Sequence, residues 1–263
     1  MIRHMIRHMM RRCLPAVVGA QLLSLAMFTS ACGSERDDAS GDIVVFAAAS
    51  LTESFTEIGQ VFMVEQPDSE VTFSFGASSD LVSQINEGAP ADVFASADQG
   101  NMARLTDAGN NGSEPVVFAT NSLEIVVEPG NPEGIAGLAD LEDRELIVVL
   151  CDPDVPIGRY SAQVFTEAGV AVEADSYEED VKAVVNKVVL GEADAGLAYS
   201  TDVVAAGDTA EGVEIPADVN VTPEYQIAVT AEARNAGGGA AFVEFVMSED
   251  GQAILQQHGF SQP

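Results

Sequence analysis

The stretch Asp42–Thr52, DIVVFAAASLT, decides the fold because it joins a strand to a helix through a turn of small residues. Ile43–Phe46 is a short apolar run rich in β-branched residues, which is typical of a buried parallel strand. Ser50 follows three alanines and is predicted to be the N-cap of the next helix. The apolar residues of that helix recur with helical spacing, at Leu51, Phe55, Ile58, Val61 and Phe62.

Such a turn can hold an anion. It offers free backbone N–H groups, the positive end of a helix dipole and the hydroxyl of Ser50 at one place. On this stretch alone, a purely capping role for Ser50 explains the turn equally well. The same order then recurs: Glu70–Phe75 alternates as a strand, Gly76–Ser79 predicts a turn, and Ser78 stands at the start of another helix.

Residues 1–31 are typical of a secretory signal sequence. They combine a basic leader, an apolar core over Leu14–Phe28 and small residues before Cys32. The sequence Ser-Ala-Cys at the end resembles a bacterial lipobox, which implies a lipid on Cys32, although Thr29 occupies a position where that motif usually has leucine. Residues 32–41 are small, polar and charged, as suits a flexible tether to a membrane surface.

The charge of the chain excludes one class of partner. The leader holds four of the 11 basic residues, which leaves seven against 42 acidic ones, a formal charge of −35. Without a basic patch to meet phosphates, nucleic-acid binding is excluded. Any anion must therefore be bound by local dipoles and hydrogen bonds against an adverse long-range field.

The cysteines predict no disulfide within the secreted part of the chain. Cys13 lies in the leader and Cys32 at the cleavage point, so Cys151 is left alone. It follows the apolar run Leu146–Leu150, and we expect it to be a buried thiol at a strand end rather than a nucleophile.

Strands alternate with helices along the rest of the chain, which predicts an α/β fold with mostly parallel sheets. Asp98 and Asp180 are predicted helix N-caps, and Pro156 suits the first turn of a helix. The glycine run Gly237–Gly239 predicts a loop. Further strands are predicted at Ala91–Ala95, Val116–Ala119, Leu123–Val127, Leu146–Leu150, Ala195–Tyr199, Val213–Pro216 and Gln226–Thr230, and a short helix at Ile135–Leu141.

A set of motifs resembles the periplasmic molybdate-binding proteins of ABC importers. The motifs cover essentially the whole secreted part of the chain in the order expected of that family. They are AAASL at Ala47–Leu51, GASSDL at Gly76–Leu81, GAPADVFASAD at Gly88–Asp98, NSL at Asn121–Leu123, DPDVPIGRY at Asp152–Tyr160, EDV at Glu179–Val181, GLAYSTDV at Gly196–Val203 and GQAILQQHGF at Gly251–Phe260.

The resemblance implies a two-lobed periplasmic-binding-protein fold of type II. Lobe one would comprise residues 41–120 and 224–263, lobe two residues 121–223, with crossings near Thr120 and Pro223. It further implies an extracytoplasmic receptor without a cofactor, which we expect to be a monomer held at the membrane by the lipid on Cys32. That protein would capture molybdate or tungstate and deliver it to an ABC permease and its ATPase.

The resemblance also implies the ligand-binding residues. Two serine hydroxyls, a tyrosine hydroxyl and backbone N–H groups bind the oxyanion in the family. Here the serines correspond to Ser50 and Ser78, the backbone donors to Ile157 and Val181, and the tyrosine to Tyr199. The family often has alanine where Ile157 stands. These same residues would hold the metal, bound as molybdate.

Ligand chemistry agrees with this site. Molybdate is a dianion that carries no proton at neutral pH, so a site made only of donors suits it, as it would sulfate. Phosphate still carries protons and needs an acceptor. Asp80 could supply one if it turned inward, but a place in the first turn of its helix is the favoured interpretation. Arg159 is predicted at the rim of the site or in solvent.

Other functions fit less well. A secreted hydrolase needs a base near Ser50 or Ser78, yet His258 is the only histidine after the leader, and no GxSxG motif occurs. We therefore predict no enzymatic activity. A sugar receptor would be expected to stack its ligand on aromatic rings, and the chain has no Trp and four Tyr. Receptors for sulfate or phosphate remain the alternatives closest to molybdate.

Overall fold

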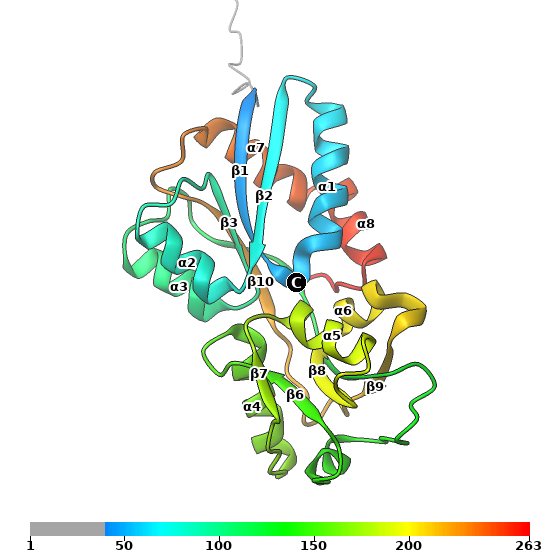
Figure 1. Ribbon diagram of the computed structural model, residues 1–263. Helices are drawn as coiled ribbons and strands as arrows, with labels where there is room; N and C mark the ends of the chain where they lie inside the picture. Colours follow the sequence, from blue (N-terminus) through cyan, green and yellow to red (C-terminus); the bar gives the residue numbers. More distant parts are fainter. Residues whose placement is uncertain (1–39) are drawn as a thin grey trace, which may run out of the picture. The chain divides into compact units, whose positions relative to one another are not determined.

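The computed structural model describes residues 40–263, which form two five-stranded sheets with helices packed on them (Figure 1). This confirms the predicted α/β fold. The signal sequence, Cys32 and the tether as far as residue 39 lie outside the described residues. Within residues 40–263, no helix combines the length and the apolar character that crossing a membrane requires.

The first sheet takes its strands from both ends of the described chain. Its order is β2-β1-β3-β10-β4. The strands are β1 (Gly41–Ala48), β2 (Ser69–Gly76), β3 (Val93–Ser96), β4 (Val116–Thr120) and β10 (Glu224–Val229). β1 runs parallel to β2 and β3, whereas β10 runs antiparallel to β3 and β4.

Helices cover both faces of this sheet (Figure 1). Successive strand residues point to opposite faces, so Phe46 packs with α2 and α3 while Val45 and Ala47 pack with α1, α7 and α8. Because helices cover both faces of the sheet, β1 is apolar at nearly every position, as its sequence predicted. The helices are α1 (Thr52–Glu65), α2 (Ser78–Asn86), α3 (Gln99–Asp107), α7 (Ala236–Met247) and α8 (Glu249–Gln257).

The second sheet has the order β7-β6-β8-β5-β9. β6 is parallel to β7 and β8, and β5 is antiparallel to β8 and β9. Each sheet therefore has as many antiparallel as parallel pairs, whereas mostly parallel sheets were predicted. The strands are β5 (Leu123–Val127), β6 (Val148–Cys151), β7 (Ser176–Glu178), β8 (Ala195–Tyr199) and β9 (Glu211–Glu214). Three helices pack on it, α4 (Pro156–Ala168), α5 (Val181–Val189) and α6 (Ser200–Ala206).

The chain passes between the sheets twice. Residues 121–122 lead from β4 to β5, and residues 215–223 lead from β9 to β10. One apolar core continues across these connections from Phe118 and Tyr225 to Leu123 and Ile125. Cys151 ends β6 as a buried free thiol, as predicted, and burial raises its pKa.

Two local predictions were wrong. Ser50 is not the N-cap of α1: it lies inside a short 3-10 helix, Ala49–Leu51, and its hydroxyl bonds another side chain. Gly237–Gly239 lie within the first turns of α7 and not in a loop. The side chain of Asn235 accepts the N–H of Gly238 and so caps the helix, and a Cβ on Gly239 would lie 3.2 Å from Val93. The glycines thus bring the helix close to the sheet.

Other local predictions were right or incomplete. Asp98 and Asp180 cap α3 and α5, and Pro156 is the first residue of α4. The short helix expected at Ile135–Leu141 is a 3-10 helix, Leu138–Glu142. β7 and α6 had not been predicted. Both are short, and α6 follows β8 without an intervening loop.

Candidate functional site

A small cavity of about 20 Å³ lies where the helix starts of both sheets converge. That space exceeds the roughly 10–15 Å³ that a single water needs, and it suits one small ligand. All five residues of the predicted oxyanion site line it: Ser50, Ser78, Ile157, Val181 and Tyr199. Each of the five is buried.

The two sheets bring these residues together at the carboxyl ends of parallel strands. Ser50 and Ser78 follow β1 and β2 of the first sheet. Ile157 and Val181 begin the helices after β6 and β7 of the second sheet, and Tyr199 is the last residue of β8. The carboxyl ends of parallel strands are where open α/β sheets bind their ligands, because the next helices start there.

The second sheet contributes backbone donors. Val181 is the first residue of α5 and Ile157 the second of α4, and N–H groups in a first helical turn have no carbonyl partner within the helix. Pro156 precedes Ile157 and sets the helical φ angle without needing a partner of its own. Gly158 allows the turn to pass close to the carbonyl oxygen of Asp152, which a Cβ would approach to 2.0 Å.

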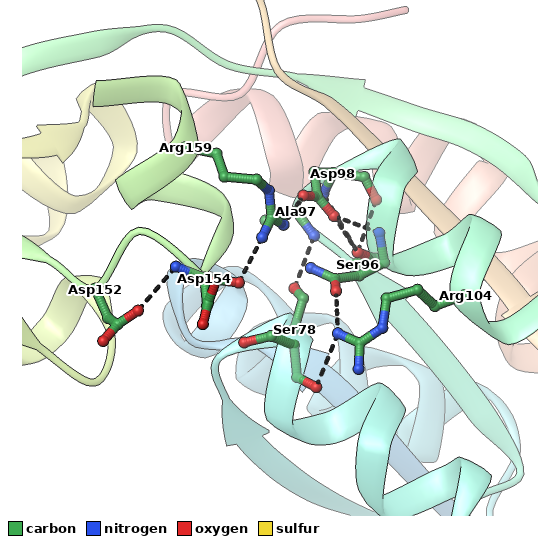
Figure 2. A network of polar contacts seen from close by, with 10 residues as sticks. Ser78, Ser96, Ala97, Asp98, Arg104, Asp152, Asp154 and Arg159 are labelled. Carbon is green, nitrogen blue, oxygen red and sulfur yellow. Dashed lines mark hydrogen bonds and ion pairs between the residues drawn. The ribbon is translucent and has the colours of Figure 1, made fainter. Parts of the chain in front are cut away.

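The first sheet contributes two hydroxyls that are themselves held in place. Ser50 Oγ lies 2.8 Å from the hydroxyl of Tyr225. Ser78 Oγ accepts the backbone N–H of Ala97 at 3.1 Å (Figure 2). Both serines are at least 95% buried, so neither hydroxyl is free to turn towards bulk water.

Tyr199 carries the one tyrosine hydroxyl that lines the cavity. Its hydroxyl is buried and has no hydrogen-bond partner among the described residues. Burial, and then the neighbouring groups Tyr225, Tyr160, Asp98 and Asp202, raise the pKa of Tyr199 well above its ordinary value. The hydroxyl therefore keeps its proton. A buried donor without a partner costs free energy, which a bound acceptor would recover.

Carboxylates at the cavity decide whether a ligand proton could be accepted. Asp80 does not line the cavity; it is exposed in the first turn of α2, as the favoured interpretation had it. Asp180 does line the cavity, but its Oδ1 accepts the N–H of Ala183 at 3.0 Å as the N-cap of α5. Asp180 is thus oriented along its own helix start.

An ion pair near the cavity joins a helix of the second sheet to a helix start of the first sheet (Figure 2). Arg159 of α4 pairs with Asp98, the N-cap of α3, and also donates to the backbone carbonyl of Asp154. The Asp98 side chain is almost fully buried, whereas Arg159 is partly exposed. Arg159 does not line the cavity, and its guanidinium offsets a buried carboxylate next to the Ser78–Ala97 contact.

A second cation, Lys182 of α5, joins the second sheet's helices to α1 of the first sheet. Lys182 Nζ lies 2.7 Å from Glu53 Oε2 of α1 and 3.0 Å from Asp202 Oδ1 of α6. Burial alone would lower the pKa of Lys182, but Asp202 and Glu53 together raise it above its ordinary value. Burial raises the pKa of Asp202 to about 6, although Lys182 acts in the opposite direction. Lys182 is therefore the counter-ion of a fully buried carboxylate.

Asp202 should make stability depend on pH. Its folded pKa of about 6 exceeds the ordinary 3.8, so the folded chain binds this proton more tightly than the unfolded chain. The resulting stabilisation is complete below about pH 4 and is lost as the pH rises through 6. Relative to an Asp202→Asn variant, wild type should lose about 2 kcal/mol between pH 4 and pH 7 in urea unfolding. A pH-independent difference would contradict this.

Comparison with known proteins places this site in a family. The model of a family described as bacterial extracellular solute-binding protein matches residues 43–261. The chain belongs to this family. The match includes every residue that lines the cavity and, apart from the first two residues of β1, both sheets.

Individual relatives agree with the family assignment. The chain is 41% identical over 221 residues to the molybdate-binding protein ModA of Mycobacterium tuberculosis. The aligned residues cover 84% of this chain and 85% of the relative. It is 30% identical to ModA of Escherichia coli, over 96% and 99% of the two chains. The solved structure of the Azotobacter vinelandii periplasmic molybdate-binding protein has the same fold, with a TM-score of 0.73, 20% identity and coverage of 84% and 99%.

Several residues around the cavity were missed by reading the sequence. Tyr225 holds Ser50 from β10, Asn121 in turn bonds the hydroxyl of Tyr225, and Lys182 of α5 pairs with Glu53 of α1. Two signals were available: Asn121 opens the motif NSL, and Lys182 directly follows Val181. Their partners could not be found in this way, because 104 and 129 residues separate the pairs Asn121–Tyr225 and Glu53–Lys182.

Proposed function

We propose that this protein is an extracytoplasmic receptor that captures molybdate, and also tungstate, and delivers it to an ABC permease and its ATPase. The observation that carries the proposal is the single cavity lined by Ser50, Ser78, Ile157, Val181 and Tyr199. Its hydroxyls and first-turn N–H groups are uncharged donors supplied by both sheets. Relatives named molybdate-binding protein at 41% and 30% identity support the choice of ligand.

Uncharged donors suffice for a dianion here. Each hydrogen bond to a charged group contributes about 1.5–3 kcal/mol, so five donors offset the cost of association with a margin that permits tight binding. The negative field of the acidic chain opposes entry of the ligand, and the nearby cations Arg159 and Lys182 are already paired with carboxylates. Salt should therefore not weaken binding, since it screens the opposing field.

We place the two lobes at residues 41–120 with 224–263 and at residues 121–223. Binding would favour a closed arrangement because Ile157, Val181 and Tyr199 reach the ligand only from the second lobe. The protein would act as a monomer without a cofactor and without enzymatic activity. A lipid on Cys32, after removal of residues 1–31, would hold it at the membrane through the tether of residues 32–41.

Calorimetry of the whole secreted chain with molybdate, tungstate, sulfate and phosphate tests the proposal. Molybdate and tungstate should bind, and phosphate should not, because the predicted site consists of hydrogen-bond donors and the carboxylate of Asp180 caps its own helix. Tight binding of phosphate would instead make Asp180 an acceptor in the site. Tight binding of sulfate with none of molybdate would make the protein a sulfate receptor.

Removing single hydroxyls tests the site itself. Ser78→Ala and Tyr199→Phe should each weaken molybdate binding by about 10- to 150-fold, since each variant loses one hydrogen bond to a charged ligand. Tyr177→Phe is the matched control, because Tyr177 lies exposed on β7 and should change nothing. Unaltered binding in both site variants would show that the ligand sits elsewhere.

A further inference from the structure

The hydroxyl of Ser50 is the end of a chain of hydrogen bonds that begins where the polypeptide crosses between the sheets. Asn121, in the link from β4 to β5, is buried and makes four side-chain hydrogen bonds. Its Oδ1 accepts the backbone N–H of Ser122 at 2.9 Å and the hydroxyl of Ser200 at 2.9 Å. Because a backbone N–H can only donate, the amide oxygen and nitrogen of Asn121 are assigned without ambiguity.

The orientation of Asn121 then determines the direction of the next bonds. Its Nδ2 donates to Thr201 Oγ1 at 2.9 Å and to the hydroxyl of Tyr225 at 3.3 Å. Tyr225 is fully buried, and the contacts of its hydroxyl within residues 40–263 are this amide and Ser50 Oγ. The amide cannot accept a proton, so the proton of Tyr225 is directed to Ser50.

Ser50 consequently receives a hydrogen bond at its oxygen and keeps its own proton for the cavity. The reverse direction, with Ser50 donating to Tyr225, would leave the proton of a buried tyrosine without an acceptor, which costs about 1–3 kcal/mol. Burial raises the pKa of Tyr225 well above its ordinary value, so that proton is always present. Ser78 reaches the same state by a separate route, through the N–H of Ala97.

We propose that Tyr225 and Asn121 are positioning residues that fix the Ser50 hydroxyl as a donor towards the ligand. This inference rests on the proposed function and deepens it: the site would select oxyanions that carry no proton. A ligand with an O–H group, such as hydrogen phosphate, meets the hydroxyl protons of Ser50 and Ser78 where its own proton needs an acceptor. Neither Tyr225 nor Asn121 lines the cavity, so both act through Ser50.

The test is a double-mutant cycle read by molybdate calorimetry. Tyr225→Phe should weaken molybdate binding by about five- to tenfold, the effect of one neutral hydrogen bond. In a Ser50→Ala background the same change should have no further effect, because its route to the ligand is gone. In a Ser78→Ala background it should keep its full effect, since Ser78 is oriented by Ala97. An equal loss in all three backgrounds would overturn the inference.

A second readout tests the selection against protonated ligands. In Tyr225→Phe, Ser50 is free to rotate and can accept a proton from the ligand. The ratio of the melting-temperature rise with phosphate to the rise with molybdate should therefore be larger in this variant than in wild type. An unchanged ratio would overturn the proposed donor direction. Thr201→Val is the matched control: it removes the other acceptor of the Asn121 amide, leaves Tyr225 in place and should keep affinity within about twofold.

Two further measurements separate the possible failures. The ligand-free melting temperature of each variant shows whether it is folded; the loss of one hydroxyl should lower it by only a few degrees. If wild type itself binds no molybdate, the proposed function fails. If wild type binds and the effects of Tyr225 and Ser50 are simply additive, the function stands and the positioning role is wrong.

Discussion

Replacing Gly158 by alanine is expected to weaken molybdate binding by at least about tenfold and to destabilise the protein. The new Cβ would lie 2.0 Å from the carbonyl oxygen of Asp152, 2.7 Å from its carbonyl carbon and 2.9 Å from the carbonyl oxygen of Cys151. All three are backbone atoms and cannot rotate away, so the end of β6 or the start of α4 must shift. We expect a loss of about 3 kcal/mol in the free energy of unfolding, measured in urea.

The binding defect follows from the same shift. Ile157 precedes Gly158 and lines the cavity, so moving the first turn of α4 removes its N–H from the ligand and disturbs the turn that presents it. Loss of this one hydrogen bond to a charged ligand corresponds to about 10- to 150-fold in affinity. Gly137→Ala is the control, because Gly137 has an extended φ of 177° and no atom within 4 Å of an added Cβ. Normal binding by Gly158→Ala would mean that α4 does not present the ligand donor.

Of the substitutions considered that remove one charged side chain, Lys182→Met should lower the free energy of unfolding most. Lys182 is the cation next to Asp202, a carboxylate with 1% exposure. Removing one member of a buried pair leaves the other charge without compensation, which costs about 3–5 kcal/mol. We expect this loss at pH 8 and a smaller one at pH 5, because Asp202, with a pKa of about 6, then carries a proton. Urea unfolding at the two pH values measures both.

A second substitution identifies the cause. Adding Asp202→Asn to Lys182→Met should recover most of the lost stability at pH 8, because no buried charge then remains. Lys187→Met is the matched control: Lys187 lies on the same helix and pairs with Glu178 in a more exposed position, so its loss should cost about 1 kcal/mol or less. A Lys182→Met variant that is as stable as this control would contradict the role of Lys182 as counter-ion.

Reading the sequence located most of the elements that build the site. The apolar run before Ser50 predicted β1, the acidic caps Asp98 and Asp180 marked the starts of α3 and α5, and Pro156 marked the start of α4. These signals are local: a strand that is buried on both faces needs apolar residues throughout, and a helix start needs an acceptor for its free N–H groups. A chain with such signals in order predicts its α/β class.

The errors share one physical reason. Ser50 has the composition of an N-cap, yet the hydroxyl of Tyr225 competes for it across 175 residues, and the helix begins two residues later. Gly237–Gly239 have the composition of a loop, yet the cap at Asn235 and close packing on Val93 make them helical. In both places a contact with a distant segment outweighs a local preference of about 1 kcal/mol or less.

The sequence alone determined the alternation of strands and helices and the acidic charge, because these depend on neighbours along the chain. The candidate donors to an anion came from its resemblance to a family. Only the tertiary structure decided that Ser50, Ser78, Ile157, Val181 and Tyr199 share one cavity. It alone also decided which way their protons are directed. Those properties depend on which strand ends meet and which buried groups face each other, and the packing of two sheets sets both.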